Sequence, residues 1–428
     1  MVSVGILLAV ALSQSLERPR IVSPNKFVVT YWWSPPPEET TPERYREIAT
    51  AGFNLVMPGA VDLPVDKARA HNLRVLDLCK ANGLKAVILD SRVTDAKPSS
   101  PNFGRDLDAV VKDFARHPAL YGYFVADEPS DRDFPRLAAI CEGLRKRDPK
   151  HVAYINLVPV VAGGMFGGPP FRNDPKDYPA ERDAYTKHVE NYIAQVKPTL
   201  VSYDEYDLFV GGGIRGMYFA NLELIRRLAG EHRIPFWNIV LVTPHVHPHG
   251  TYRDPSLDDL RFLMYTTLAY GARGMCYFTY FTPPGGFGDA IIGKDGKPTR
   301  HYNEVRSLNF ELYRLAPTLC KLKSDGVYHV GKLPLECQPL PSDTILTKVD
   351  GSDVVVSFLS DSGRGRYLMI VNKDMTQSQR IGIQFANDYS LRELSAVDGK
   401  WRSVPGLRDF SSDYLPGQGK LFSYNSKR

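Results

Sequence analysis

The sequence predicts an α/β fold, a (β/α)₈ barrel followed by an antiparallel β-sandwich domain. Between residues 25 and 322, short segments rich in β-branched and aromatic residues alternate eight times with amphipathic helical segments. The length of this region suits an eight-unit barrel. After residue 325 the helical period ends, and short apolar segments follow one another, separated by Gly, Asp and Ser turns. We therefore expect a barrel domain at 25–322 and a β-sandwich domain at 325–428.

A doubly wound open sheet is the competing architecture. Such a sheet carries a Gly-rich phosphate-binding loop after its first strand. Here the first expected strand ends in Trp32, Trp33 and Ser34, and three prolines follow. The sequence therefore favours the barrel.

The elements are expected where apolar runs are bounded by turn and cap residues. Thr41 precedes a proline as an N-cap does, and Gly83 follows a helix as a C-cap does. The expected barrel strands are 27–33, 53–57, 85–89, 120–126, 152–157, 200–203, 236–242 and 273–280, and the helices with clear bounds are 106–116, 134–147, 182–196, 219–231, 256–270 and 302–315. The expected sandwich strands are 327–330, 345–349, 354–359, 367–372, 380–385, 391–397 and 421–424.

Composition excludes several classes of protein. Hydrophobic residues make up 43% of the 428-residue chain and charged residues 24%, as in a globular protein with a large core. The net charge of +5 is spread along the sequence without a basic block, so we expect no nucleic-acid partner. The five cysteines have no metal-ligand spacing. Cys320 and Cys337 flank the expected domain junction, and the sequence does not decide whether they form a disulfide.

The first fifteen residues resemble a secretory signal peptide. An apolar stretch at 4–12 is followed by Ala11-Leu12-Ser13, a small-x-small pattern of the kind that precedes cleavage. The stretch is too short to span a membrane, and no other segment reads as transmembrane. We therefore expect a secreted or periplasmic protein with no membrane association, and the sequence leaves its oligomeric state open.

The fourth barrel strand carries the most informative motif. In the segment 120–129, Leu-Tyr-Gly-Tyr-Phe-Val-Ala-Asp-Glu-Pro, an apolar strand ends at two adjacent carboxylates, and Pro129 prevents the strand from continuing. In α/β barrels the carboxyl ends of the strands hold the chemistry, and a carboxylate pair is the usual equipment for cleaving a glycosidic bond. Burial should raise the pKa of such a carboxyl and keep it protonated. We assign the acid role to Glu128, which projects farther past the strand end than Asp127. The competing interpretation is that the tetrapeptide Asp127-Glu128-Pro129-Ser130 only caps the next helix.

Other polar and aromatic residues fall at or near the ends of expected strands. Because these ends meet at one rim, carboxylates, amides and aromatic rings should converge there as they do in a sugar site. The residues expected to contact substrate are Tyr31, Trp32, Trp33, Asp90, Arg92, Asn156, Tyr203, Trp237, His245, His247 and Tyr280.

The second catalytic carboxylate has several candidates. Asp204 and Glu205 end the sixth strand, and since neighbouring side chains on a strand point to opposite faces, we expect only one of them in the cavity. Asp90 is a third candidate, but its spacing from Arg92 is more typical of an internal ion pair that positions substrate. His245 and His247 could chelate a metal ion, yet no third ligand with matching spacing appears, so we expect neither a metal nor another cofactor.

These motifs resemble those of known glycoside hydrolases. The segment 263–280, Leu-Met-Tyr-Thr-Thr-Leu-Ala-Tyr-Gly-Ala-Arg-Gly-Met-Cys-Tyr-Phe-Thr-Tyr, is similar to the region leading into the eighth strand of family 42 β-galactosidase-like barrels. That resemblance implies that Glu128 is the acid/base. The nucleophile of those enzymes ends the seventh strand, where this chain has no carboxylate.

The adjacent Asp127 and Glu128 also resemble the pair in family 20 and family 123 β-N-acetylhexosaminidases. There the substrate's own acetamido group attacks the anomeric carbon. The resemblance implies that Asp127 orients this group and that Glu128 protonates the leaving group, which would explain the missing seventh-strand carboxylate.

The sequence thus predicts an enzyme that hydrolyses O-glycosidic bonds of an oligo- or polysaccharide. We expect Glu128 to be its acid/base. The second catalytic group is either a sixth-strand carboxylate, Asp204 or Glu205, or the substrate's own acetamido group oriented by Asp127. Two alternatives stay open: a non-catalytic carbohydrate-binding barrel, and a metal-dependent hydrolase using His245 and His247.

Overall fold

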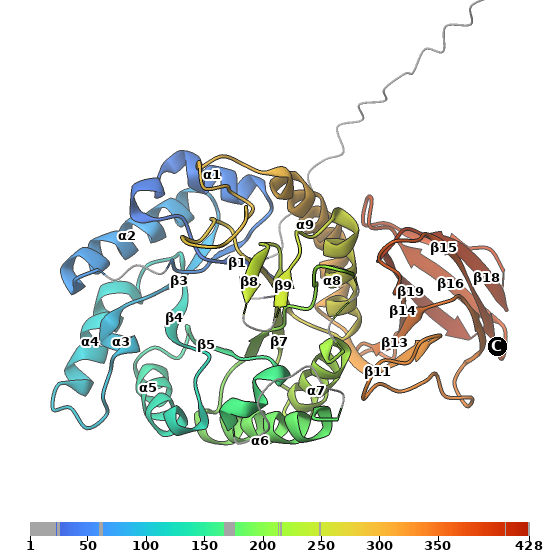
Figure 1. Ribbon diagram of the computed structural model, residues 1–428, viewed down its shortest axis with the longest axis horizontal. Coiled ribbons are helices and arrows are strands. Elements are labelled where there is room, and N and C mark those ends of the chain that lie inside the picture. Colours follow the sequence, from blue (N-terminus) through green and yellow to red (C-terminus); the bar gives the residue numbers. More distant parts are fainter. Residues whose placement is uncertain are drawn as a thin grey trace, which may run out of the picture.

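The computed structural model describes residues 23, 26–59, 63–166, 176–212, 214, 216–247, 250–406 and 408–426. The expected signal peptide at 1–15 lies outside these residues. Figure 1 shows a barrel domain with a β-sandwich beside its helices α8 (Leu257–Ala269) and α9 (Arg300–Leu319). The predicted fold class is confirmed.

All eight predicted barrel strands form, and they pair in parallel. The sheet order is β1-β10-β7-β6-β5-β4-β3-β2, so that consecutive strand–helix units are neighbours and the first strand lies beside the last. Their bounds are β1 (Val28–Trp32), β2 (Leu55–Val56), β3 (Lys85–Ile88), β4 (Leu120–Asp127), β5 (Val152–Leu157), β6 (Val201–Asp204), β7 (Phe236–Leu241) and β10 (Gly274–Phe278).

The helices surround this sheet and bury their apolar faces on it. Thr41 accepts a hydrogen bond from the Arg44 amide and Pro42 opens the first helix, as the N-cap signal predicts. Besides α8 and α9, whose bounds are already given, the described α-helices are α1 (Pro42–Thr50), α2 (Val65–Ala81), α3 (Ser91–Thr94), α4 (Phe103–Phe114), α5 (Phe134–Arg147), α6 (Tyr178–Val196) and α7 (Tyr218–Glu231). Among the described residues, no helix is both long and apolar enough to cross a bilayer.

An asparagine side chain joins the first two strands and so closes the barrel. Asn54, just before β2, accepts a hydrogen bond from the Val29 amide at 2.9 Å and donates one to the Phe27 carbonyl at 2.8 Å. Thr30 donates its hydroxyl to the Leu55 carbonyl at 2.9 Å. Side chains therefore supply bonds where the two-residue β2 is too short to form a regular ladder.

The barrel interior is filled by aromatic rings rather than left open. Trp237 packs 5.7 Å from Tyr154 and 6.0 Å from Tyr121, centroid to centroid. A Cβ placed on Gly274 would lie 2.4 Å from the Trp237 indole, so only glycine lets the ring cross the neighbouring strand there. These rings form the floor beneath the carboxyl ends of the strands.

The C-terminal domain is a β-sandwich with its own core, centred on Val356, Ile370 and Phe422. One sheet has the order β11-β13-β14-β19-β16-β17 and the other the order β12-β15-β18. All seven predicted strands form, and the sequence did not predict β17 and β18. The bounds are β11 (Lys323–Val330), β12 (Leu346–Asp350), β13 (Val354–Ser360), β14 (Arg366–Asn372), β15 (Gln379–Phe385), β16 (Tyr389–Leu394), β17 (Trp401–Val404), β18 (Asp409–Tyr414) and β19 (Gly419–Ser426).

The two domains share one apolar core at their junction. Val355, Met369 and Leu421 of the larger sandwich sheet belong to the same buried cluster as the barrel. Ser357 donates its hydroxyl to the carbonyl of Ala269, the last residue of α8, at 2.6 Å. The domains therefore form a single packed body. All five cysteines are free thiols, so no disulfide joins Cys320 to Cys337.

Candidate active site

A cavity of about 610 Å³ lies at the carboxyl ends of the barrel strands. Seven of the predicted site residues line it, and three of these carry carboxyl groups. The lining residues that the sequence predicted are Trp32, Asp127, Glu128, Asn156, Asp204, His245 and His247.

The fourth-strand pair reaches the cavity through an irregular backbone. Asp127 is the last residue of β4, and the pairing of β4 with β5 shifts register between Phe124 and Ala126. Glu128 follows with a φ of 46°, in the left-handed region, while its amide donates to the Asn156 carbonyl at 2.9 Å. Because the chain turns at Glu128, its side chain and that of Asp127 both line the cavity instead of pointing to opposite faces.

Asn156 holds two of the three carboxyl groups. Its side-chain amide donates to Asp127 at 3.2 Å and to Asp204 at 2.9 Å. Its carbonyl oxygen accepts the Ser202 hydroxyl at 3.0 Å, and the Tyr154 hydroxyl lies 2.8 Å from Ser202. This chain of hydrogen bonds fixes which way the amide points. We therefore assign Asn156 a positioning role in addition to its predicted place at the substrate.

The third carboxyl group, that of Asp204, is in hydrogen-bonding contact with Glu128. Burial raises the pKa of Asp204 well above its usual range, and the negative charges of Glu128 and Asp127 raise it further. Burial also raises the pKa of Glu128, but the hydrogen bond with Asp204 opposes this rise. The proton of this pair therefore resides on Asp204, which donates it to Glu128.

Asp127 titrates near neutrality. Burial and the charge of Glu128 raise its pKa to about 7, and the hydrogen bond from Asn156 partly offsets the rise. Both Asp127 and Glu128 are exposed to water in the open cavity while the surrounding walls exclude much of the bulk solvent. Near neutral pH the cluster therefore holds at least one proton beside at least one negative charge, which are the requirements of acid catalysis.

The contact between Glu128 and Asp204 has a mechanistic consequence. A retaining glycosidase holds its acid and nucleophile about 5–5.5 Å apart, and an inverting one holds its two carboxyl groups farther apart, because the anomeric carbon or a water must fit between them. Two carboxyl groups that share a hydrogen bond leave no such room. This geometry argues against Asp204 as the nucleophile opposite Glu128.

Aromatic rings form the walls of the cavity, and the sequence analysis did not assign most of them to the site. The Tyr206 and Phe278 rings lie 4.9 Å apart, and His245 packs 4.7 Å from Tyr252 and 4.9 Å from Phe287. The His245 Nδ1 is 2.9 Å from the Thr243 carbonyl, so it donates there, and burial lowers the pKa of the ring. A neutral His245 thus belongs to an apolar wall able to pack on a sugar ring.

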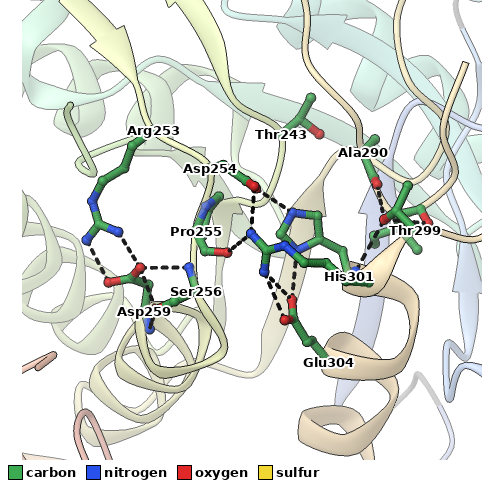
Figure 2. Close-up of polar contacts among 12 residues, drawn as sticks. Thr243, Arg253, Asp254, Pro255, Ser256, Asp259, Ala290, Thr299, His301 and Glu304 are labelled. Atoms are coloured by element: carbon green, nitrogen blue, oxygen red, sulfur yellow. Dashed lines mark hydrogen bonds and ion pairs between the residues drawn. The ribbon is translucent and has the colours of Figure 1, made fainter.

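Part of this wall is a short hairpin formed by β8 (His245–His247) and β9 (Gly250–Tyr252), where a loop was expected. The chain after Tyr252 is tied to two helix starts (Figure 2). Arg253 forms an ion pair with Asp259 in the first turn of α8. Asp254 accepts from His301 at 2.8 Å and pairs with Arg300 at 2.7 Å, both at the start of α9. These bonds hold the hairpin in position over the site.

Eight predicted site residues do not line the cavity: Tyr31, Trp33, Asp90, Arg92, Tyr203, Glu205, Trp237 and Tyr280. Tyr31, Tyr203 and Glu205 precede or follow inward-facing residues, so the alternation of the strand turns them toward the helices, where all three are buried. Trp237 is the second residue of β7 and lies in the barrel floor, at the end away from the cavity.

The remaining four are held by other contacts. Asp90 caps α3 and pairs with Arg92 at 2.7 Å, and Arg92 also pairs with Asp113 of α4 at 3.0 Å. The predicted internal ion pair is thus confirmed, but outside the cavity. The Tyr280 hydroxyl donates to Glu47 at 2.6 Å, and Trp33 has a φ of 62°, which turns the chain away after β1.

The register of the strands explains one missed residue. Phe278 is paired with both Trp32 and Leu241 at the same level of the sheet, so it shares the inward face with Trp32. From this strand the sequence analysis chose Tyr280, two residues later, instead. Tyr252 comes from the unpredicted strand β9, Met165 from a 3₁₀ segment and Phe287 from a loop, and the predicted strand patterns describe none of these. Among the described residues, no cluster of His, Cys, Asp and Glu is suited to a metal ion.

We test the positioning role of Asn156 with Ser202→Ala. Without the Ser202 hydroxyl the Asn156 amide is free to turn, and its bond to Asp127 weakens. The pKa of Asp127 should then rise above about 7, so the acid limb of the kcat/KM profile should move to higher pH while kcat on the plateau falls by about tenfold or less. Ser307→Ala on the exposed face of α9 is the matched control. An unmoved acid limb would show that Ser202 has only a packing role.

Comparison with known proteins supports the fold. No protein-family model matches the chain, and no curated protein sequence matches it. A solved "glycoside hydrolase" is similar over 94% of this chain and 93% of its own, with 11% identity and a TM-score of 0.56. A family 5 glycoside hydrolase from Bacteroides vulgatus matches over 94% and 89%, with 12% identity and a TM-score of 0.55.

A third structure is a family 27 β-L-arabinopyranosidase from Geobacillus stearothermophilus in complex with arabinose. It covers 95% of this chain and 98% of its own, with 12% identity and a TM-score of 0.51. Each match covers nearly the whole chain, so the likeness extends over both the barrel and the sandwich. At this level of identity the likeness establishes the fold, and the resemblance to family 42, 20 or 123 stays a prediction.

Proposed function

We propose that the protein is a glycoside hydrolase and that Glu128 is its proton donor. The observation that carries the proposal is the cluster of three carboxyl groups, Asp127, Glu128 and Asp204, in an aromatic-walled cavity at the carboxyl ends of the strands. The likeness to solved glycoside hydrolases over both domains is consistent with it. Carboxyl groups with raised pKa values, beside aromatic rings that can pack on a sugar, favour acid-catalysed cleavage of a glycosidic bond.

In the proposed reaction, a proton moves from Asp204 to Glu128 and from Glu128 to the leaving oxygen. The bond from the anomeric carbon to that oxygen breaks, and its electron pair stays with the oxygen, which takes the proton. Water then attacks the anomeric carbon and displaces the group that attacked it in the first step. The water gives a proton to Glu128, and Glu128 returns a proton to Asp204. Asp204 thus serves as a proton reservoir, and Glu128 is the catalytic residue because it is exposed in the cavity whereas Asp204 is buried.

The nucleophile in the first step is the finer part of the proposal. Asp204 lies too close to Glu128 for that role, Glu205 does not line the cavity, and β7 ends without a carboxylate. We therefore favour a 2-acetamido sugar whose carbonyl oxygen attacks the anomeric carbon. Ionised Asp127 would accept the N–H of the acetamido group and stabilise the positive charge that develops there.

A panel of aryl glycosides tests both parts. We expect release of the aryl alcohol, with kcat/KM for the 2-acetamido sugars at least about tenfold above that for the matching 2-hydroxy sugars. Turnover of the 2-hydroxy sugars alone would overturn the acetamido mechanism but not the glycosidase. Glycan binding without turnover of any member would instead identify a carbohydrate-binding barrel, and inhibition by a chelator would favour the metal-dependent alternative.

A further inference from the structure

A second cavity, of about 320 Å³, lies between the end of α9 and the larger sandwich sheet. None of its lining residues belongs to the cavity at the barrel mouth. Among the described residues that line it there are three cations, two aromatic rings and several hydroxyl or amide groups, but no Asp or Glu. We call it the junction groove; the residues that matter for its chemistry are Lys321, Arg366, Tyr367, Arg392, Trp401 and Ser423.

The register of the sheet builds one wall of the junction groove. Ser423 of β19 is paired with Tyr367 of β14 on one side and with Arg392 of β16 on the other, so the three side chains form a row on one face. The adjacent row on that face, which contains Met369 and Leu421, is buried against the barrel. The polar row therefore lies where the sheet emerges from the domain junction.

Aromatic and cationic groups are combined in this wall. The Arg392 guanidinium lies 5.9 Å from the centroid of the Trp401 ring, and the Tyr367 ring lies 6.2 Å from it. The Tyr367 hydroxyl donates to Asp361 at 3.1 Å, which fixes the ring. Flat aromatic faces pack on the apolar face of a pyranose, and a guanidinium fork matches a carboxylate or sulfate group.

The cations of the junction groove lack ordinary ion-pair partners. Lys321, Arg366 and Arg392 are all exposed, and within the described part of the chain none of them has an acidic group within salt-bridge distance. Most other arginines of the sandwich are paired, such as Arg380 with Asp413 and Arg402 with Asp398. An anionic ligand bound in the groove would be attracted by all three of these positive charges.

We propose that the junction groove is a second carbohydrate site, which binds a sugar residue bearing a carboxylate or sulfate group. The acidic residue would differ from the residue that is cleaved, because three carboxyl groups and no Lys or Arg are found among the described residues lining the cavity at the barrel mouth. The substrate would then be a heteroglycan that contains both acidic and uncharged residues.

Calorimetric titration of Glu128→Gln protein tests the proposal without turnover. The probes are polygalacturonate, dextran sulfate and neutral dextran, at physiological salt. We expect at least one of the two acidic polymers to bind, dextran to bind far more weakly, and Arg392→Gln and Trp401→Ala each to raise Kd by about tenfold or more. Which acidic polymer binds distinguishes the carboxylate from the sulfate.

Arg380→Gln is the matched control, since it removes one exposed positive charge from the sandwich outside the groove. If it weakens binding as much as Arg392→Gln does, the net charge of the protein attracts the polymer and the proposal is wrong. Failure of both acidic polymers to bind, or equal binding of neutral dextran, also overturns it. Because binding is measured on a variant that lacks the proposed proton donor, these outcomes are independent of whether the protein is a glycosidase.

Discussion

Replacing Glu128 with glutamine should lower kcat by about 10²–10⁴-fold, because general acid catalysis contributes that much. Glutamine keeps the shape of the side chain but cannot deliver the proton that Asp204 supplies. Aryl glycosides with good leaving groups need little protonation, so their rates should fall least. Steady-state kinetics on a series of leaving groups of increasing pKa would measure this trend.

The control for this variant is Glu231→Gln, which removes an exposed carboxylate at the end of α7. It should leave the kinetics unchanged. Glu128 is exposed in the cavity rather than packed in the core, so Glu128→Gln should fold normally, and its thermal unfolding should confirm this. Retention of most activity on every leaving group would rule out Glu128 as the acid.

Asp204→Asn should separate activity from stability. Loss of the buried proton source should lower kcat by about 10²-fold or more. The stability of the variant relative to wild type should instead increase as pH rises. Burial raises the pKa of Asp204 in the folded protein, so the wild-type protein loses stability as pH increases above the unfolded pKa of about 3.9 toward the higher folded value. Asparagine cannot ionise, so the variant lacks this loss.

The measurement is urea unfolding of both proteins from pH 5 to pH 9. The free energy of unfolding of Asp204→Asn relative to wild type should increase with pH. Asp183→Asn, on an exposed position of α6, should show no such trend. A constant difference between Asp204→Asn and wild type would mean that Asp204 is ionised in the folded protein throughout, and would contradict its role as proton reservoir.

The elements that the sequence predicted best are those whose apolar residues recur with a regular period because one or both of their faces are buried. Helix α5 has the predicted bounds, 134–147, and all eight barrel strands were found. The hairpin β8–β9 and the strands β17 and β18 were missed. Their residues are mostly exposed or half-buried, so few apolar positions mark a period of two.

The sequence placed residues at the cavity correctly when it indicated both their position along the strand and the face of the strand to which the side chain points. Asp127, Glu128, Asn156 and Asp204 end their strands or lie next to the end and face inward. Trp237 does not line the cavity because it is near the start of β7, and Tyr203 does not because it is one residue out of phase with Asp204. The hydrogen bond between Glu128 and Asp204 depends on how two non-adjacent strands approach each other, which no local pattern encodes.

The stack of Trp237, Tyr154 and neighbouring rings closes the barrel beneath the carboxyl cluster. A glycan that is cleaved as proposed cannot thread through the barrel, so both fragments must leave through the mouth of the cavity. We expect the fragment nearer the opening to leave first and the deeper one to follow. A slow exit of the deeper fragment would therefore limit turnover, and that sugar, added free, should act as a competitive inhibitor.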